Sequence, residues 1–443
     1  MADSSLFPGS EVNTDGKSPV DQQQPARLRR PDRRQVLLRP CSLEELLAAD
    51  HKARLFWNVV QRLDLRTFYR GIQARGSVPG RAATDPQLLV TLWLYATSEG
   101  VGSARELARL CESHDAYRWI CGGVGVNHHG LSDFRVNHGV ALDELLTQVI
   151  ASLVDKKLIS VHRISQDGTR VRAMAGAASF RREKRLAELL EQAKAHVAEL
   201  KQQLEAPAAA SLSERKKAAM ERAARERQER LEEALAQMPR LKEIAENPKN
   251  RKALREKPPK ASTTDANARP MRMPDGGTRP AYNVQLAMDT QSRAIVGVDV
   301  INIGSDNSQA ADMRQQVEER TGRKVEEHLV DGGYLNLDQI REAHDDAVAM
   351  YVPAPKRKDG TDPYTPRPED DEAILAWRQR MTDDRSGELY KLRAQTIETA
   401  NADLKTHRGL NKILVRGMEN VLCVALWASL TYNLLHFGTA LLN

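Results

Sequence analysis

A long charged helical stretch lies between two β-rich segments, and this arrangement limits the possible folds more than any other feature. Residues 159–173 (ISVHRISQDGTRVRA) are rich in β-branched side chains, with Asp167-Gly168 at a turn-like point. Alternating strand patterns resume after Pro280. They then alternate with helical patterns in the order β, insertion, β, β, α, β, α, β, α. This order predicts an α/β fold with a mixed sheet flanked by helices, which the helical stretch interrupts without ending it.

The inserted stretch has a heptad-like seam with apolar spacings of 4, 3, 4, 3 and 4, formed by Leu186, Leu190, Ala193, Val197, Leu200 and Leu204. The repeat breaks near Pro207, and Ser211 with Glu214 then form a plausible capping box for a second helix. We therefore expect an antiparallel helical hairpin. Pairing between subunits is a competing use of the same seam.

The segment before the first strand, residues 41–155, is mostly helical in pattern. Pro86 is placed for a first helical turn and Gly100 follows the end of the same pattern. Several short helices joined by glycine-rich turns predict a compact all-α module. Modules of this kind can place a helix in a DNA groove.

Basic residues gather in two places, although Lys and Arg (66) exceed Asp and Glu (60) by only 6. Residues 26–39 hold six Arg against one Asp, and residues 249–260 hold six Lys or Arg against one Glu. Contact with nucleic-acid phosphates and solvated linkers are equally good interpretations of either run. The first 25 residues have the composition of a disordered tail.

Residues 421–442 carry no Asp, Glu, Lys or Arg and are long enough to cross a membrane. Polar side chains such as Asn433 and His436 would then lie at bilayer depth, which is costly. A buried core helix is the favoured interpretation. Four cysteines in 443 residues are too few for a disulfide scaffold. None of them forms a C-x-x-C pair, which argues against a cysteine-based zinc site.

Three separated carboxylates follow or lie on predicted core elements: Asp167, Asp331 and Glu398. A mixed α/β sheet can bring strand ends and a flanking helix together. Clustered carboxylates need a cation, and hard oxygen ligands suit Mg²⁺ or Mn²⁺. Two such ions, ~3.5–4 Å apart, stabilise the attacking and leaving oxygens of a phosphoryl displacement.

A helix expected from about Gly387 to Leu404 carries the pattern Y-x2-R-x4-E-x6-K, formed by Tyr390, Arg393, Glu398 and Lys405. At ~100° per residue these side chains would fall within an arc of about 140° on one face. Such a face would present a carboxylate to metal and cations to phosphate. On the spacing alone, an ordinary helix with an exposed charged stripe is the favoured interpretation.

Four further residues have weaker claims. Asp265 is either a turn residue or a support for the site. Tyr282, Asn283 and Gln285 either contact the DNA backbone or are half-buried strand residues.

Six strings stand in this order along the chain: DPQLLVTLWLYATSEG, YRWICGGVGVNHHGLSDFR, SQDGTRVRA, RPAYNVQLAMD, VDGGY and YKLRAQTIETANADLKTHRGL. Together they resemble the DDE transposases of bacterial insertion sequences, in the broad IS4-like group, and the IS1182 family within it. The resemblance covers residues 40–440. It implies an RNase H-like catalytic domain in which Asp167, Asp331 and Glu398 are catalytic and bind Mg²⁺ or Mn²⁺, as two ions. It also implies DNA contacts by Tyr390, Arg393 and Lys405. The gap from Arg393 to Glu398 is four residues, where the broader group has three.

The resemblance and the patterns predict five parts: a disordered tail (1–25), a basic arm (26–40), a helical DNA-binding module (41–155), an RNase H-like catalytic domain (156–177 and 262–443) and a coiled-coil-like insertion (178–261). The expected function is transposition: binding of terminal inverted repeats, cleavage and strand transfer. The alternatives are a metal-dependent nuclease and an inactive, transposase-derived DNA-binding protein. We expect double-stranded terminal and target DNA as partners, a homo-oligomer on DNA, and a bacterial cytoplasmic, nucleoid-associated location without a membrane.

Overall fold

The computed structural model describes residues 42–75, 82–205, 213–246, 258–358 and 360–443. The predicted tail and basic arm lie outside the described residues, as does most of the basic run at 249–260.

The N-terminal part is helical, and its helix α3 (Pro86–Ser98) begins at a local cap. Asp85 accepts a hydrogen bond from the amide of Gln87, and Pro86 occupies the first helical turn, where its missing N–H costs nothing. The elements are η1 (Glu44–Leu46), α1 (Lys52–Val60), α2 (Arg66–Tyr69), α3 (Pro86–Ser98), α4 (Ala104–Ser113), α5 (Asp115–Cys121), α6 (His128–Val136) and α7 (Gly139–Asp155).

The mixed sheet has the strand path β6-β5-β1-β7-β8, with β4 paired to the first part of β5. β1 pairs antiparallel with β5 and parallel with β7, and β7 pairs parallel with β8. This is the topology of an RNase H-like fold, as predicted. The strands are β1 (Arg163–Arg172), β4 (Arg269–Arg272), β5 (Thr278–Asp289), β6 (Ile295–Ile301), β7 (Glu327–Leu329) and β8 (Ala349–Tyr351).

The turn-like reading of Asp167-Gly168 is wrong. Both residues lie inside β1, whose pairing with β5 continues past them from Ile164 to Arg172. Glycine within a strand often marks a close approach by another group. Here a Cβ at Gly168 would overlap the side chains of Gln285 and Asp306.

The two faces of β1 meet different elements, because side chains alternate along a strand. On one face, Ser165 lies 2.9 Å from Thr396 Oγ1, in the π-helical turn η5 (Ala394–Glu398). On the other, Gln166 donates to the Gln309 carbonyl at 3.0 Å, just before α12 (Ala310–Thr321). The remaining C-terminal elements are η4 (Gly332–Tyr334), α13 (Leu337–Asp345), α14 (Glu372–Thr382), α15 (Asp384–Arg393) and α16 (Thr399–His407).

The apolar C-terminal segment forms α17 (Met418–Leu442), which is mostly buried and contacts α3, α7 and β6. By length and composition alone it would pass as a membrane span. Its polar residues bond inside the protein, however. The Asn433 side chain accepts from the Ile295 amide at 2.9 Å and donates to its carbonyl at 2.8 Å. The interpretation as a core helix is confirmed.

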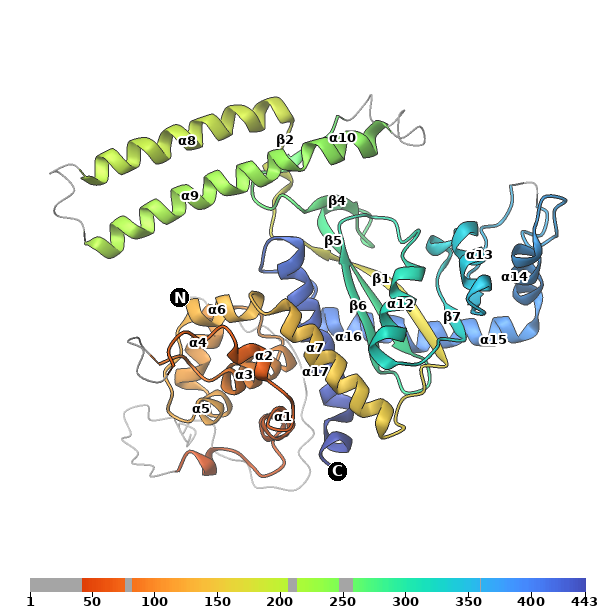
Figure 1. Ribbon diagram of the computed structural model, residues 1–443, viewed down its shortest axis with the longest axis horizontal. Helices are drawn as coiled ribbons and strands as arrows, with labels where there is room; N and C mark the ends of the chain where they lie inside the picture. The colour runs from red at the N-terminus through yellow and green to blue at the C-terminus, as the bar shows by residue number, and fades with distance from the viewer. Residues whose placement is uncertain (1–41, 76–81, 206–212, 247–257, 359) are drawn as a thin grey trace, which may run out of the picture. The chain divides into compact units, whose positions relative to one another are not determined.

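The helical insertion folds as a hairpin of α8 (Glu183–Glu205) and α9 (Glu214–Ala236), continued by α10 (Met238–Glu246) (Figure 1). Most of its seam is buried within the chain, where Leu186 and Leu190 pack in one cluster with Leu231 and Ala234, whereas Val197 and Leu204 are partly exposed. A short sheet of β2 (Phe180–Arg181) and β3 (Ala261–Ser262) joins the flanking segments. Ser211, the predicted cap, lies outside the described residues. The cap of α9 is Ser213, which accepts from the Lys216 amide, so the predicted capping box is wrong.

Candidate active site

Asp167 projects from the middle of β1 toward Arg393, at the end of α15, and toward α16. Its side chain is 17% exposed. Asn401 of α16 donates to Oδ2 at 3.1 Å, and the guanidinium of Arg393 lies 3.0 Å from Oδ1. Pairing with β5 continues through Asp167, opposite Leu286, and fixes its position along the sheet, whereas pairing with β7 ends at Ser165.

Asp331 lies two residues beyond the end of β7, which is the strand parallel to β1. Its Oδ1 accepts from the Gly333 amide at 2.7 Å and so caps the short helix η4. A Cβ at Gly332 would come within 3.1 Å of the Pro353 carbonyl, so the turn leaves little room for another residue there. The geometry places a half-exposed carboxylate beside the end of the sheet.

Glu398 ends a π-helical turn, and this turn explains the unusual spacing of the helix signature. In a regular α-helix, side chains five residues apart point about 140° away from each other. The π turn absorbs one extra residue, as such single turns do at many functional sites. Arg393 Nη1 consequently donates to Glu398 Oε1 at 2.8 Å. The expectation of one regular helix from Gly387 to Leu404 is wrong in this respect.

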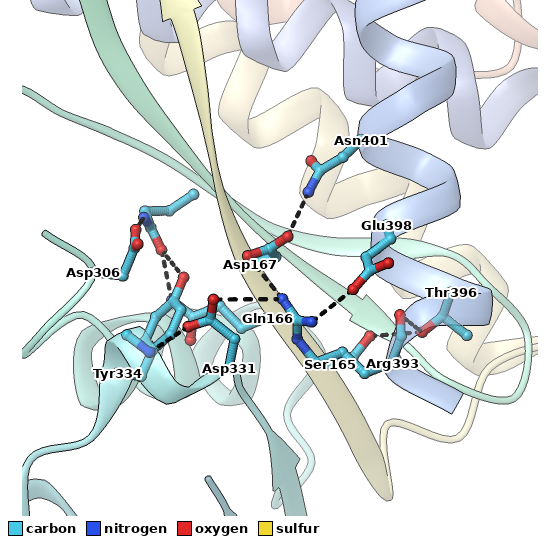
Figure 2. A network of polar contacts seen from close by, with 12 residues as sticks. Ser165, Gln166, Asp167, Asp306, Asp331, Tyr334, Arg393, Thr396, Glu398 and Asn401 are labelled. Carbon is cyan, nitrogen blue, oxygen red and sulfur yellow. Dashed lines mark hydrogen bonds and ion pairs between the residues drawn. The ribbon is translucent and has the colours of Figure 1, made fainter. Parts of the chain in front are cut away.

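Arg393 is the shared partner of the three predicted catalytic carboxylates (Figure 2). Its guanidinium lies 3.0 Å from Asp167, 2.8 Å from Glu398 and 3.9 Å from Asp331, with only 8% of its side chain exposed. Although burial lowers it, these charges raise the pKa of Arg393 above its ordinary value. In this state the arginine holds the acids together and does not face outward toward a phosphate. Its predicted DNA contact stays a prediction.

Tyr390 and Lys405 lie at the edges of the same cluster and are half-buried. The Arg393 guanidinium lies 5.9 Å from the centre of the Tyr390 ring. Burial lowers the pKa of Lys405, and the negative charge of Asp167 opposes that shift. The structure thus brings all six predicted site residues into one region.

The acidic side chains around Asp167 outnumber the basic ones. Burial raises the pKa of Asp167 to about 6; Arg393 lowers it, and the charges of Asp331, Asp306 and Glu398 raise it further. Among the described residues, no three acidic, imidazole or thiol side chains are spaced to hold an ion as they stand. The donor set nonetheless fits a hard divalent cation, because carboxylate oxygens are its preferred ligands. The buried amide oxygen of Asn401, which has no hydrogen-bond partner among the described residues, adds another hard oxygen ligand.

Sequence reasoning missed Asn401 and Asp306. Asn401 lies three residues after Glu398, so helical spacing could have pointed to it. Asp306 follows β6 in a loop, where no local pattern marks it. Its Oδ1 accepts from Asn283 Nδ2 at 2.7 Å and from Gln285 Nε2 at 2.6 Å.

The weaker candidates turn out to be buried. Tyr282, Asn283 and Gln285 are at most 1% exposed, so they form no DNA-facing surface in this structure. Tyr282 donates its hydroxyl to Asp265 Oδ1, which also accepts from the Gly417 amide at 3.2 Å. Asp265 therefore joins β5 to the start of α17 and takes no part in the carboxylate cluster.

Comparisons with known families agree with this geometry. Residues 41–137 match the family model described as Transposase domain (DUF772), and residues 253–434 match the Transposase DDE domain. The second match includes Asp331 and Glu398, whereas Asp167 precedes it. No curated protein and no solved structure matches the chain significantly. The first match covers most of the helical module, and the second covers most of the sheet and the C-terminal helices. Together the two matches show that the chain belongs to the DDE transposases of insertion sequences, the group that includes the IS1182 family.

Proposed function

We propose that Asp167, Asp331 and Glu398 are the catalytic carboxylates of this transposase and that they bind two Mg²⁺ ions. The observation that supports this most directly is their convergence on one guanidinium, from a strand, a turn and a helix far apart in sequence. When bound, the ions would activate the attacking water or 3′-hydroxyl and take up charge on the leaving oxygen. Mn²⁺ would serve the same ligands.

Each protein group then has a separate task. Asp167 is fixed by strand pairing and by Asn401, so it sets the position of the site on the sheet. Before the cation binds, the positive charge of Arg393 offsets the negative charges of the three carboxylates. Once the cation is bound, the Arg393 guanidinium separates from them. A released guanidinium can form a bidentate bond with a DNA phosphate, and Lys405 adds a point charge beside it.

The helical module (41–155) would recognise the terminal inverted repeats, and residues 156–177 with 262–443 would carry out cleavage and strand transfer. The α8–α9 hairpin leaves its charged faces to solvent. Transposition joins two ends of one element, so we infer a dimer or larger homo-oligomer on DNA. The substrate implies a bacterial cytoplasmic protein associated with the nucleoid.

The test uses a labelled duplex that carries the terminal repeat, with Mg²⁺, with Mn²⁺ and with EDTA. The isosteric variants Asp167→Asn, Asp331→Asn and Glu398→Gln should bind the duplex but not cut it. Glu388→Gln is the matched control, because Glu388 is exposed on α15 of the same helical segment. Joining of the cut 3′ end to a target plasmid distinguishes a transposase from a nuclease. Equal cutting by wild type and all three variants would refute the assignment.

A further inference from the structure

A fourth carboxylate, Asp306, borders the same small space as Asp331. The position that a Cβ would take at Gly333 lies 2.9 Å from Asp331 Oδ1 and 3.6 Å from Asp306 Oδ2. Asp306 also lies against the backbone of Gly168, the residue after Asp167. Gly168, which follows Asp167, and Gly333, two residues after Asp331, therefore both leave room for this one side chain.

The side chain of Asp306 is held in place by a buried amide pair. Asn283 and Gln285, which are 0% and 1% exposed, both donate to Oδ1. Gln285 is itself oriented from two sides, because its Oε1 accepts from Gln166 Nε2 at 3.1 Å and from the hydroxyl of Tyr334. This hydrogen-bond network fixes the orientation of the Asp306 carboxylate, which would otherwise rotate freely in its loop.

The other oxygen of Asp306 is not used by the protein. Within the described part of the chain, no group donates a hydrogen bond to Oδ2, and no Lys, Arg or His forms an ion pair with Asp306. Arg393 compensates the other three acids but does not contact this one. Beside it, the buried Asn283 Oδ1 has no partner either. An anchored carboxylate with a free oxygen at the edge of an acidic site is suited to a hydrated cation.

We propose that Asp306 is a positioning residue of this active site, which strengthens divalent-cation binding by accepting a hydrogen bond from a water of the ion held by Asp167 and Asp331. This inference rests on the proposed function and adds a fourth acid to its three. Groups that act on a metal through its ligands typically change affinity by roughly 10–100-fold when removed.

The test measures Mn²⁺ binding to the full chain without DNA, by electron paramagnetic resonance of the free ion. Asp306→Asn keeps the shape and can still accept from both amides through its oxygen. We expect its Mn²⁺ dissociation constant to rise roughly tenfold or more. The melting temperature in EDTA should not fall, and DNA-end binding in EDTA should be unchanged. Asp312→Asn, which removes an exposed acid from the first turn of α12, should bind Mn²⁺ like wild type.

The possible outcomes separate this inference from the proposed function. If Asp167→Asn and Asp331→Asn lose Mn²⁺ but Asp306→Asn does not, Asp306 has no role toward the cation and the three-acid site stands. If Asp306→Asn mainly lowers the melting temperature in EDTA, the residue only anchors its loop and the inference is wrong. If Asp167→Asn and Asp331→Asn bind Mn²⁺ like wild type, the three-acid metal site itself is refuted.

Discussion

The ionised side chain of Asp167 should destabilise the metal-free protein, so that Asp167→Asn makes it more stable. Burial is the main cause, since it raises the pKa of this carboxyl from 3.8 to about 6 although Arg393 opposes the shift. The folded state therefore binds the proton more tightly than the unfolded chain. Stability is lost as the pH rises from about 4 to about 6, and it stays lost at higher pH.

The size of the effect follows from the shift of about 2 units. At ~1.4 kcal/mol per unit, ionised Asp167 costs the folded state about 3 kcal/mol at pH 7.5. By the same linkage the cost falls to about 1 kcal/mol at pH 4.5. An introduced amide carries no charge at either pH. Asn401 can accommodate it by rotating its side-chain amide, because its Oδ1 has no other partner.

The assay is thermal unfolding in EDTA at pH 7.5 and pH 4.5, compared between wild type and Asp167→Asn. The variant should melt higher at pH 7.5, and most of its advantage should vanish at pH 4.5. Adding Mn²⁺ at pH 7.5 should raise the melting temperature of the wild type but hardly that of the variant. Asp338→Asn, at a side chain 90% exposed, serves as the control for loss of one acidic charge. A variant that is no more stable than wild type at pH 7.5 would refute the reasoning.

Three more substitutions test how the site is supported. Gly168→Ala should abolish cleavage but leave binding of the DNA end intact in a gel-shift assay. The added Cβ would overlap the side chains of Asp306 and Gln285, which pack against the strand at this point. Tyr282→Phe should lower the free energy of unfolding by about 1–3 kcal/mol, since it removes one of the two donors to Oδ1 of the buried Asp265 and leaves only the Gly417 amide; an unchanged denaturation midpoint would contradict this. Asn433→Ala removes both bonds to the Ile295 backbone and should cost at least as much, measured by the same denaturation.

The order and type of the main elements could be predicted from the sequence because they depend on local patterns. Alternating β-branched residues predict the strands, and heptad spacing predicts the hairpin at residues 178–261. The carboxylates were found through strings in which the surrounding residues carry the information, as in SQDGTRV and VDGGY. The structure supports their proximity, while their catalytic roles rest on the experiments above.

Tertiary structure decided the features that depend on partners distant in the sequence. Gly168 lies within a strand because β5 pairs along its whole length, and it must be glycine because Asp306 packs against it. The five-residue separation of Arg393 and Glu398 is compatible with one site only through the π turn, which Ser165 of β1 contacts at Thr396. No local sequence pattern could show that Asp306, in the loop after β6, lies beside the Gly332-Gly333 turn that follows β7. Such contacts form only when the strands and helices pack together, so no local sequence pattern predicts them.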